Sequence, residues 1–136
     1  MHIANFSYTG ALVAGVIGFI VGAAWYAPFT FGPLWLRYNP AALDNITAGG
    51  KLQRYVVSLA GSLVQAFVLA IVLAATSQPD LGAALVFGFL LWLGFTAAPS
   101  LVDYLLSRRP MGGWAVDISH RLLVTLAVAF VLGVWG

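Results

Sequence analysis

The sequence predicts an all-α integral membrane protein, a four-transmembrane-helix bundle with a long first loop carrying an interfacial segment. Hydrophobic residues make up 62% of the 136 residues and charged residues only 7%, against roughly a quarter charged in soluble domains. So few charges do not cover a water-facing surface, and four apolar runs are long enough to cross a bilayer core of about 30 Å. We expect residues 1–136 to form a single membrane domain with helices at about 8–27, 55–75, 81–106 and 114–135.

The first predicted helix, 8–27, ends before Pro28. No Lys or Arg precedes it, so we expect a retained span and not a cleaved signal peptide. Ala14, Gly18 and Gly22 recur every four residues and give it a smooth face for a neighbouring helix.

The first loop, residues 28–54, is rich in aromatic residues and prolines, which is typical of a segment lying at the membrane interface. Within it, Asn39 before Pro40 predicts the start of a short helix that runs to about Ile46.

The second helix, 55–75, carries its own small-residue face at Ser58, Ser62 and Ala66. This face has two interpretations, a packing interface within the bundle and a seam between copies of the chain. Only the short turn TSQPD separates this helix from the third, which predicts an antiparallel hairpin.

The third helix, 81–106, contains Pro99, which removes a backbone hydrogen bond and predicts a kink. A polar stripe follows one face of this helix at helical spacing. Its members are Thr96, Ser100, Asp103 and Ser107.

The fourth helix, 114–135, contains the polar stretch DISHR, residues 117–121. A span that began after this stretch would be only about 21 Å long, too short to cross the membrane. Asp117, His120 and Arg121 are therefore predicted inside the span, on one helical face, with Asp117 and Arg121 at the spacing of a helical ion pair.

The short third loop brings the two polar faces to the same membrane side, so we expect one intramembrane cluster. Its predicted members are Asp103, Asp117, His120 and Arg121, with Gln65 deeper in the second helix. A histidine beside carboxylates is expected to titrate near physiological pH. Two interpretations stay open: the cluster is a clasp between helices, or it handles a proton, an ion or a ligand.

Basic residues are confined to one side of the predicted membrane. Outside the spans they are Arg37, Lys51, Arg54, Arg108 and Arg109, all in or beside the first and third loops. The positive-inside rule places these loops in the cytoplasm and both termini on the other side. Five aromatic residues near the helix ends are expected to anchor the interfaces: Trp25, Tyr26, Trp35, Trp114 and Trp135.

The stretch GAAWYAPFTFGPLW, residues 22–35, resembles the signature of an uncharacterised bacterial family of small four-span membrane proteins, the domain of unknown function 1761 family. The later stretch LVDYLLSRRPMGGWAVDISHRLL, residues 101–123, is also similar, although Asp103 stands where the family usually has Asn. The resemblance implies a bacterial inner-membrane protein and supplies no activity, cofactor or substrate.

The sequence contains no cysteine and none of the common hydrolase, metalloprotease or phosphate-loop motifs, so we expect no enzyme, metal or cofactor. A formal charge of +2 is too small for nucleic-acid binding. We expect a structural or accessory membrane subunit whose partners are lipids and either further copies or a larger complex. The alternative is a small oligomeric transporter or channel that uses the Asp/His/Arg cluster.

Overall fold

The computed structural model describes residues 7–26, 32–38, 48–76 and 80–135, and every element in these ranges is helical. Four helices are long and apolar enough to cross a membrane, which confirms the predicted fold class. The elements are α1 (Tyr8–Trp25), α2 (Gly32–Tyr38), α3 (Ala48–Ala75), α4 (Leu81–Trp92), a π-helical turn η2 (Leu93–Ala97), α5 (Ala98–Leu106) and α6 (Met111–Trp135).

Several helix bounds differ from those expected. α1 ends at Trp25 instead of 27, with Tyr26 as its C-terminal cap. α3 begins at Ala48, before the apolar run that starts near 55, because Lys, Leu, Gln and Arg favour helix as strongly as apolar residues do. α6 begins at Met111, directly after Pro110. The short helix expected at 39–46 lies outside the described residues.

Two helix starts are capped by side chains. The Ser7 hydroxyl accepts a hydrogen bond of 3.0 Å from the Gly10 amide, and an Asp80 carboxylate oxygen accepts one of 2.8 Å from the Ala83 amide. Each cap satisfies an amide that has no partner inside its own helix.

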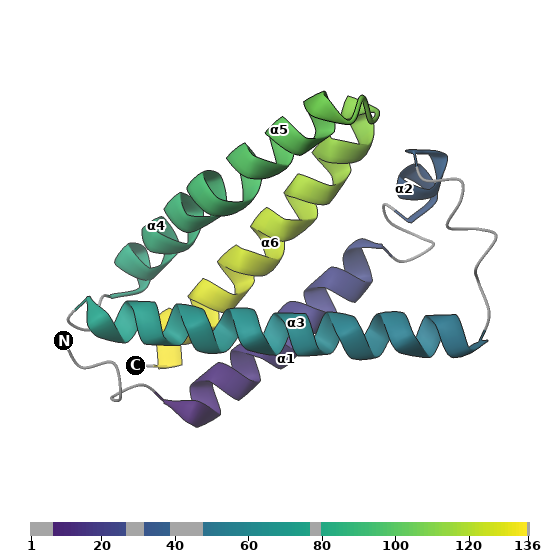
Figure 1. Cartoon of the computed structure of the whole chain (residues 1–136). Helices are drawn as coiled ribbons and strands as arrows, with labels where there is room; N and C mark the ends of the chain where they lie inside the picture. The colour runs from purple at the N-terminus through teal and green to yellow at the C-terminus, as the bar shows by residue number, and fades with distance from the viewer. Residues whose placement is uncertain (1–6, 27–31, 39–47, 77–79, 136) are drawn as a thin grey trace.

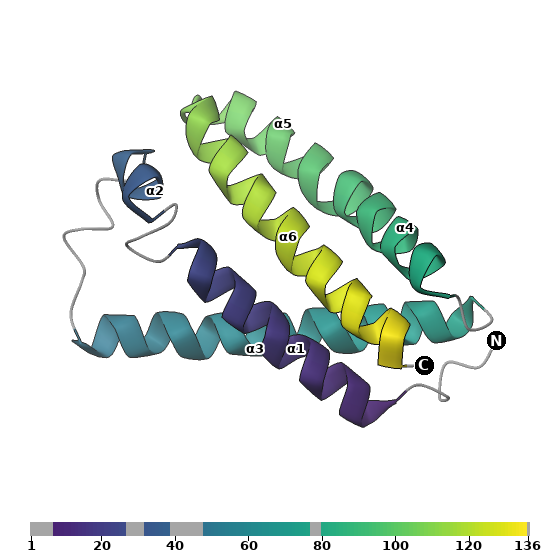
Figure 2. The same ribbon diagram turned by 180° about the vertical axis from the view of Figure 1, so that it is seen from behind.

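α6 is the central helix of the bundle. α4, η2 and α5 run along one side of it, and α1 packs against its other side. α3 crosses α1 and meets the rest of the bundle mainly through that helix, so its first half lies away from α5 and α6 (Figures 1 and 2). The ends of α1 and α5 and the start of α6 therefore lie at one end of the bundle.

The core is built from small side chains. Ala14, Ala66, Ala84, Val128 and Ala129 are completely buried. Such residues let helix backbones approach closely, which is how helices associate in lipid.

Parts of both predicted small-residue faces pack against each other within one chain. Ser62 of α3 is buried and its hydroxyl donates a 2.6 Å hydrogen bond to the Gly15 carbonyl of α1. A β-carbon added to Gly18 would lie 2.7 Å from the Ser62 oxygen. Ser58, one turn earlier on α3, is exposed, so the interpretation as a packing interface within the bundle does not hold for this residue.

The third span contains a π-helical turn directly before the expected kink. Residues Leu93–Ala97 form η2, and the Ala98 amide donates to the Leu93 carbonyl five residues back. Pro99 then lies in the first turn of α5, where its missing N–H is tolerated. The wider π turn thus accommodates the proline within one continuous span.

Candidate functional site

The most connected polar side chain at this end of the bundle is Asp117 of α6. The Tyr26 hydroxyl at the end of α1 donates to Asp117 Oδ1 over 2.6 Å, and the Tyr104 hydroxyl of α5 donates to Oδ2 over 2.7 Å. We call these three residues the tyrosine–aspartate clasp. It joins the first, third and fourth spans through a single carboxylate.

The surroundings of Tyr26 favour its protonated form. Burial, followed by the hydrogen bond to Asp117 and its negative charge, raises the pKa of the Tyr26 phenol, which lies just past the end of the α1 span. A phenol with a raised pKa stays neutral and keeps its O–H as a donor. Hydrogen bonds to a carboxylate are also about twice as strong as neutral ones.

His120 is positioned by packing against Tyr26 and Gly22. Its ring lies 4.6 Å from the Tyr26 ring, centroid to centroid, at an interplanar angle of 44°. A β-carbon on Gly22 would lie only 2.7 Å from His120 Nε2. Within the described part of the chain the imidazole has no hydrogen bond to Asp117, whose two described donors are both tyrosine hydroxyls.

The expected ion pair between Asp117 and Arg121 is not formed. Both residues are described, and the Asp117 carboxylate faces the two tyrosines instead. Arg121 lines a pocket beside Asp117, together with groups from the third span. The i, i+4 spacing would suit an ion pair on an isolated helix. In the bundle, Asp117 instead accepts hydrogen bonds from tyrosines of two other helices.

This pocket has a volume of about 380 Å³ and lies between α6 and the η2–α5 segment. Its polar lining comprises Thr96, Ser100, Asp103, Arg109, Asp117 and Arg121. The predicted polar stripe of the third helix thus faces the DISHR stretch across a shared cavity. Two carboxylates and two guanidinium groups leave the lining without formal net charge.

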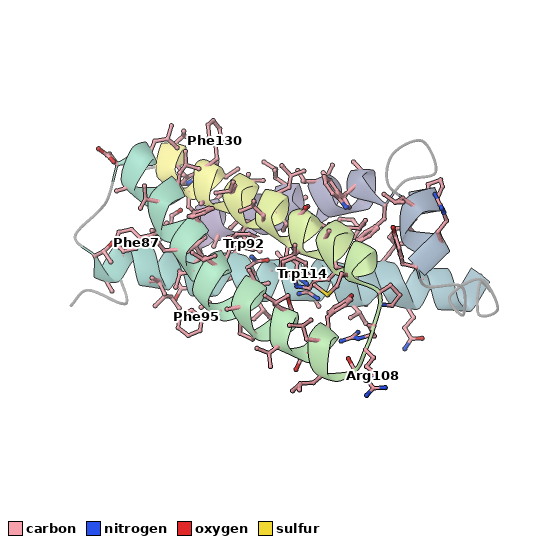
Figure 3. The ribbon with its side chains drawn as sticks, turned by 90° about the horizontal axis from the view of Figure 1, so that it is seen from above. Phe87, Trp92, Phe95, Arg108, Trp114 and Phe130 are labelled. Carbon is pink, nitrogen blue, oxygen red and sulfur yellow. The ribbon has the colours of Figure 1, made fainter. Side chains whose placement is uncertain are left out.

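Two groups complete the wall of the pocket. The Arg109 guanidinium lies 4.0 Å from the centroid of the Tyr104 ring, in cation–π geometry. The Trp114 indole N–H donates to Ser100 Oγ over 2.9 Å. The Trp92 and Trp114 side chains lie between α6 and the third span, whereas Phe95 points away from α6 (Figure 3).

The expected role of the aromatic anchors needs correction at two positions. Tyr26 and Trp114 direct their polar atoms at protein groups and not at headgroups, because polar partners inside the bundle are within reach. Trp135 is partly exposed and its ring lies over Gly10, while Trp25 is partly buried. The Trp35 side chain lies outside the described residues.

Gln65 does not belong to the cluster. Its side-chain amide donates 2.7 Å to the Thr125 hydroxyl, one helical turn beyond Arg121 on α6. It is also absent from the pocket lining. An amide in an apolar span pairs with the nearest acceptor, and Thr125 is nearer than the carboxylates.

Sequence reasoning missed Tyr104 and treated Tyr26 only as an anchor. Tyr104 lies four residues after Ser100, so its hydroxyl extends the polar stripe. It was missed because tyrosine was counted as an aromatic residue and not as a polar one. Tyr26 gave no such signal, because its partner lies 91 residues away in sequence.

A family model described as "Protein of unknown function (DUF1761)" matches residues 9–133. No curated protein and no solved structure matches the chain.

Proposed function

The chain belongs to the DUF1761 family, and from this premise we propose that it is a structural or accessory subunit of the bacterial cytoplasmic membrane without enzymatic activity. The observation that carries this proposal is how the intramembrane polar groups are used. In the described spans three of them link helix to helix: Asp117 to two tyrosines, Ser62 to Gly15, and Gln65 to Thr125. Polar groups used in this way hold a bundle together.

The other half of the bundle supports the same proposal. Beyond Gln65 and Thr125, the described interior is closed by small and branched apolar residues. They include Ala14, Leu69, Leu73, Ala84, Val128 and Val131. Among the described residues, such a close-packed interior offers no polar route across one copy of the chain. A proton or ion relay needs polar groups along its length.

We further propose that the basic end of the bundle faces the cytoplasm and that both termini lie on the opposite side. Arg108 and Arg109 follow α5, and Arg37 lies in α2, which packs against the start of α6 through Tyr38 over Gly112 and Gly113. Positive charge gathered at one end supports this orientation. Lipids, together with further copies or a larger complex, would be the partners.

A flux assay tests the accessory role. The purified chain, reconstituted alone into liposomes with an internal pH dye, is expected to leave proton flux at the level of empty liposomes. Proton flux that requires the chain and disappears in Asp117→Asn would overturn the proposal.

The second candidate is an oligomeric transporter or channel, and the polar pocket beside the π-helical turn is the observation that favours it. Irregular helical turns often occur at functional sites. The same liposomes, loaded with a small dipolar solute, distinguish the candidates by whether the chain accelerates its release.

A further inference from the structure

Arg121 carries a charge inside a membrane span without a described partner for it. It lies within α6, yet its guanidinium has no hydrogen bond or ion pair to any described residue, and it lines the pocket. A charged side chain in a membrane span is costly unless an anion or water accompanies it. No described carboxylate forms an ion pair with this guanidinium: Asp117 accepts from the two tyrosines, and Asp103 lines the same pocket without contacting Arg121.

Asp103 presents the complementary charge in the same pocket. Its backbone carbonyl accepts from the Ser107 hydroxyl, but its carboxylate has no partner among the described residues. The pocket therefore offers one free cation and one free anion within the described chain, and the full lining has no formal net charge. This pattern complements a ligand that carries both charges.

The pocket also opens towards the apolar surroundings of the bundle. Phe95 of η2, which lines it, is 80% exposed, and Val102, about two turns further on in α5, is exposed as well. Figure 3 shows Phe95 pointing away from α6. A ligand that enters here meets hydrocarbon on one side and charged groups on the other.

We propose that this pocket binds the headgroup of a zwitterionic phospholipid, with its phosphate on Arg121 and its primary ammonium on Asp103. Guanidinium groups bind phosphate oxygens in bidentate geometry. A primary ammonium donates hydrogen bonds to a carboxylate, whereas the quaternary ammonium of phosphatidylcholine does not. The acyl chains would pass Phe95 into the bilayer. This inference does not depend on the accessory role.

Native mass spectrometry of the full chain tests the proposal, using detergent micelles doped with equal amounts of phosphatidylethanolamine, phosphatidylcholine and phosphatidylglycerol. The wild-type chain is expected to retain phosphatidylethanolamine. Arg121→Gln removes the phosphate partner and is expected to weaken retention by about tenfold. Arg37→Gln is the matched control, since it removes the same charge from an exposed site on α2 outside the pocket, and it is expected to retain the lipid like the wild type.

A second variant guards against misfolding of Arg121→Gln. Asp103 is exposed and its carboxylate holds no described group, so Asp103→Asn is expected to fold normally. This substitution gives the pocket lining a net positive charge, and the variant is expected to retain the anionic phosphatidylglycerol in preference to phosphatidylethanolamine. Equal retention of the three lipids by the wild type, or an unchanged preference in Asp103→Asn, would overturn the proposal. Displacement of the lipid by glycerophosphoethanolamine, which has no acyl chains, would instead assign the pocket to a soluble zwitterion and overturn the lipid assignment.

Discussion

At the scale of single residues, Asp117 is held by hydrogen bonds to side chains distant in sequence. Its position inside a span was predictable, because a helix without it is too short to cross. Its partners were not predictable, since Tyr26 and Tyr104 belong to other helices and reach it only in the folded bundle. The i, i+4 spacing on one helix therefore predicted Arg121 as the partner of Asp117, whereas in the structure Arg121 lines the pocket.

Removing either hydroxyl is expected to weaken the fold. Tyr26→Phe and Tyr104→Phe each delete one hydrogen bond to a carboxylate and should lower the free energy of unfolding by about 1 to 2 kcal/mol. Thermal unfolding in detergent measures this loss. Tyr55→Phe is the matched control, because the Tyr55 side chain is largely exposed on α3. An equal loss in the control would contradict the clasp.

The close contact between Gly22 and His120 gives a second prediction. Gly22→Ala places a methyl group 2.7 Å from Nε2, so it should lower the melting temperature, with an overpacking cost of about 1 to 3 kcal/mol. His120→Ala should relieve that cost in the double variant. Gly61→Ala, which meets nothing within 4 Å, is expected to be neutral or slightly stabilising. Additive effects of Gly22→Ala and His120→Ala would show that the two residues do not compete for space.

At the scale of elements, apolar length and composition were sufficient to predict four spans, because these are what the bilayer selects. The π-helical turn was not predictable, since Pro99 alone indicates only a local disturbance and leaves its form to the packing against α6. The early start of α3 was also not predicted. An apolar run indicates where a helix crosses the membrane, but the helix itself can begin before that run.

The two serines of α3 test how this helix packs. Ser62→Leu inserts a large side chain against Gly15 and Gly18 and removes a hydrogen bond, so it should destabilise the monomer by about 2 kcal/mol or more. Ser58→Leu lies on the exposed half of the same helix and should leave thermal stability unchanged. Light scattering of the Ser58→Leu protein also examines association. A smaller assembly there would identify a seam between copies.

At the scale of the whole molecule, orientation follows from where charge lies relative to the helix ends. The chain has no cysteine, so single cysteines report accessibility directly. We expect Gly82→Cys, exposed in the first turn of α4, to react with a membrane-impermeant maleimide on intact bacterial cells. Met111→Cys, exposed at the start of α6, should react only after the membrane is opened. The reverse labelling pattern would invert the proposed topology.

The central place of α6 has a consequence for biosynthesis. This helix contacts α1, α2, α4 and α5, whereas α3 and α4 barely touch one another. It also follows the other three spans in the chain, so a ribosome delivers it to the membrane after them. Until α6 is inserted, the α1–α3 pair and the third span have little surface in common, and Tyr26 and Tyr104 lack their common acceptor, Asp117. A nascent chain halted before Met111 would therefore present a packed α1–α3 pair and a third span that has little surface in common with it.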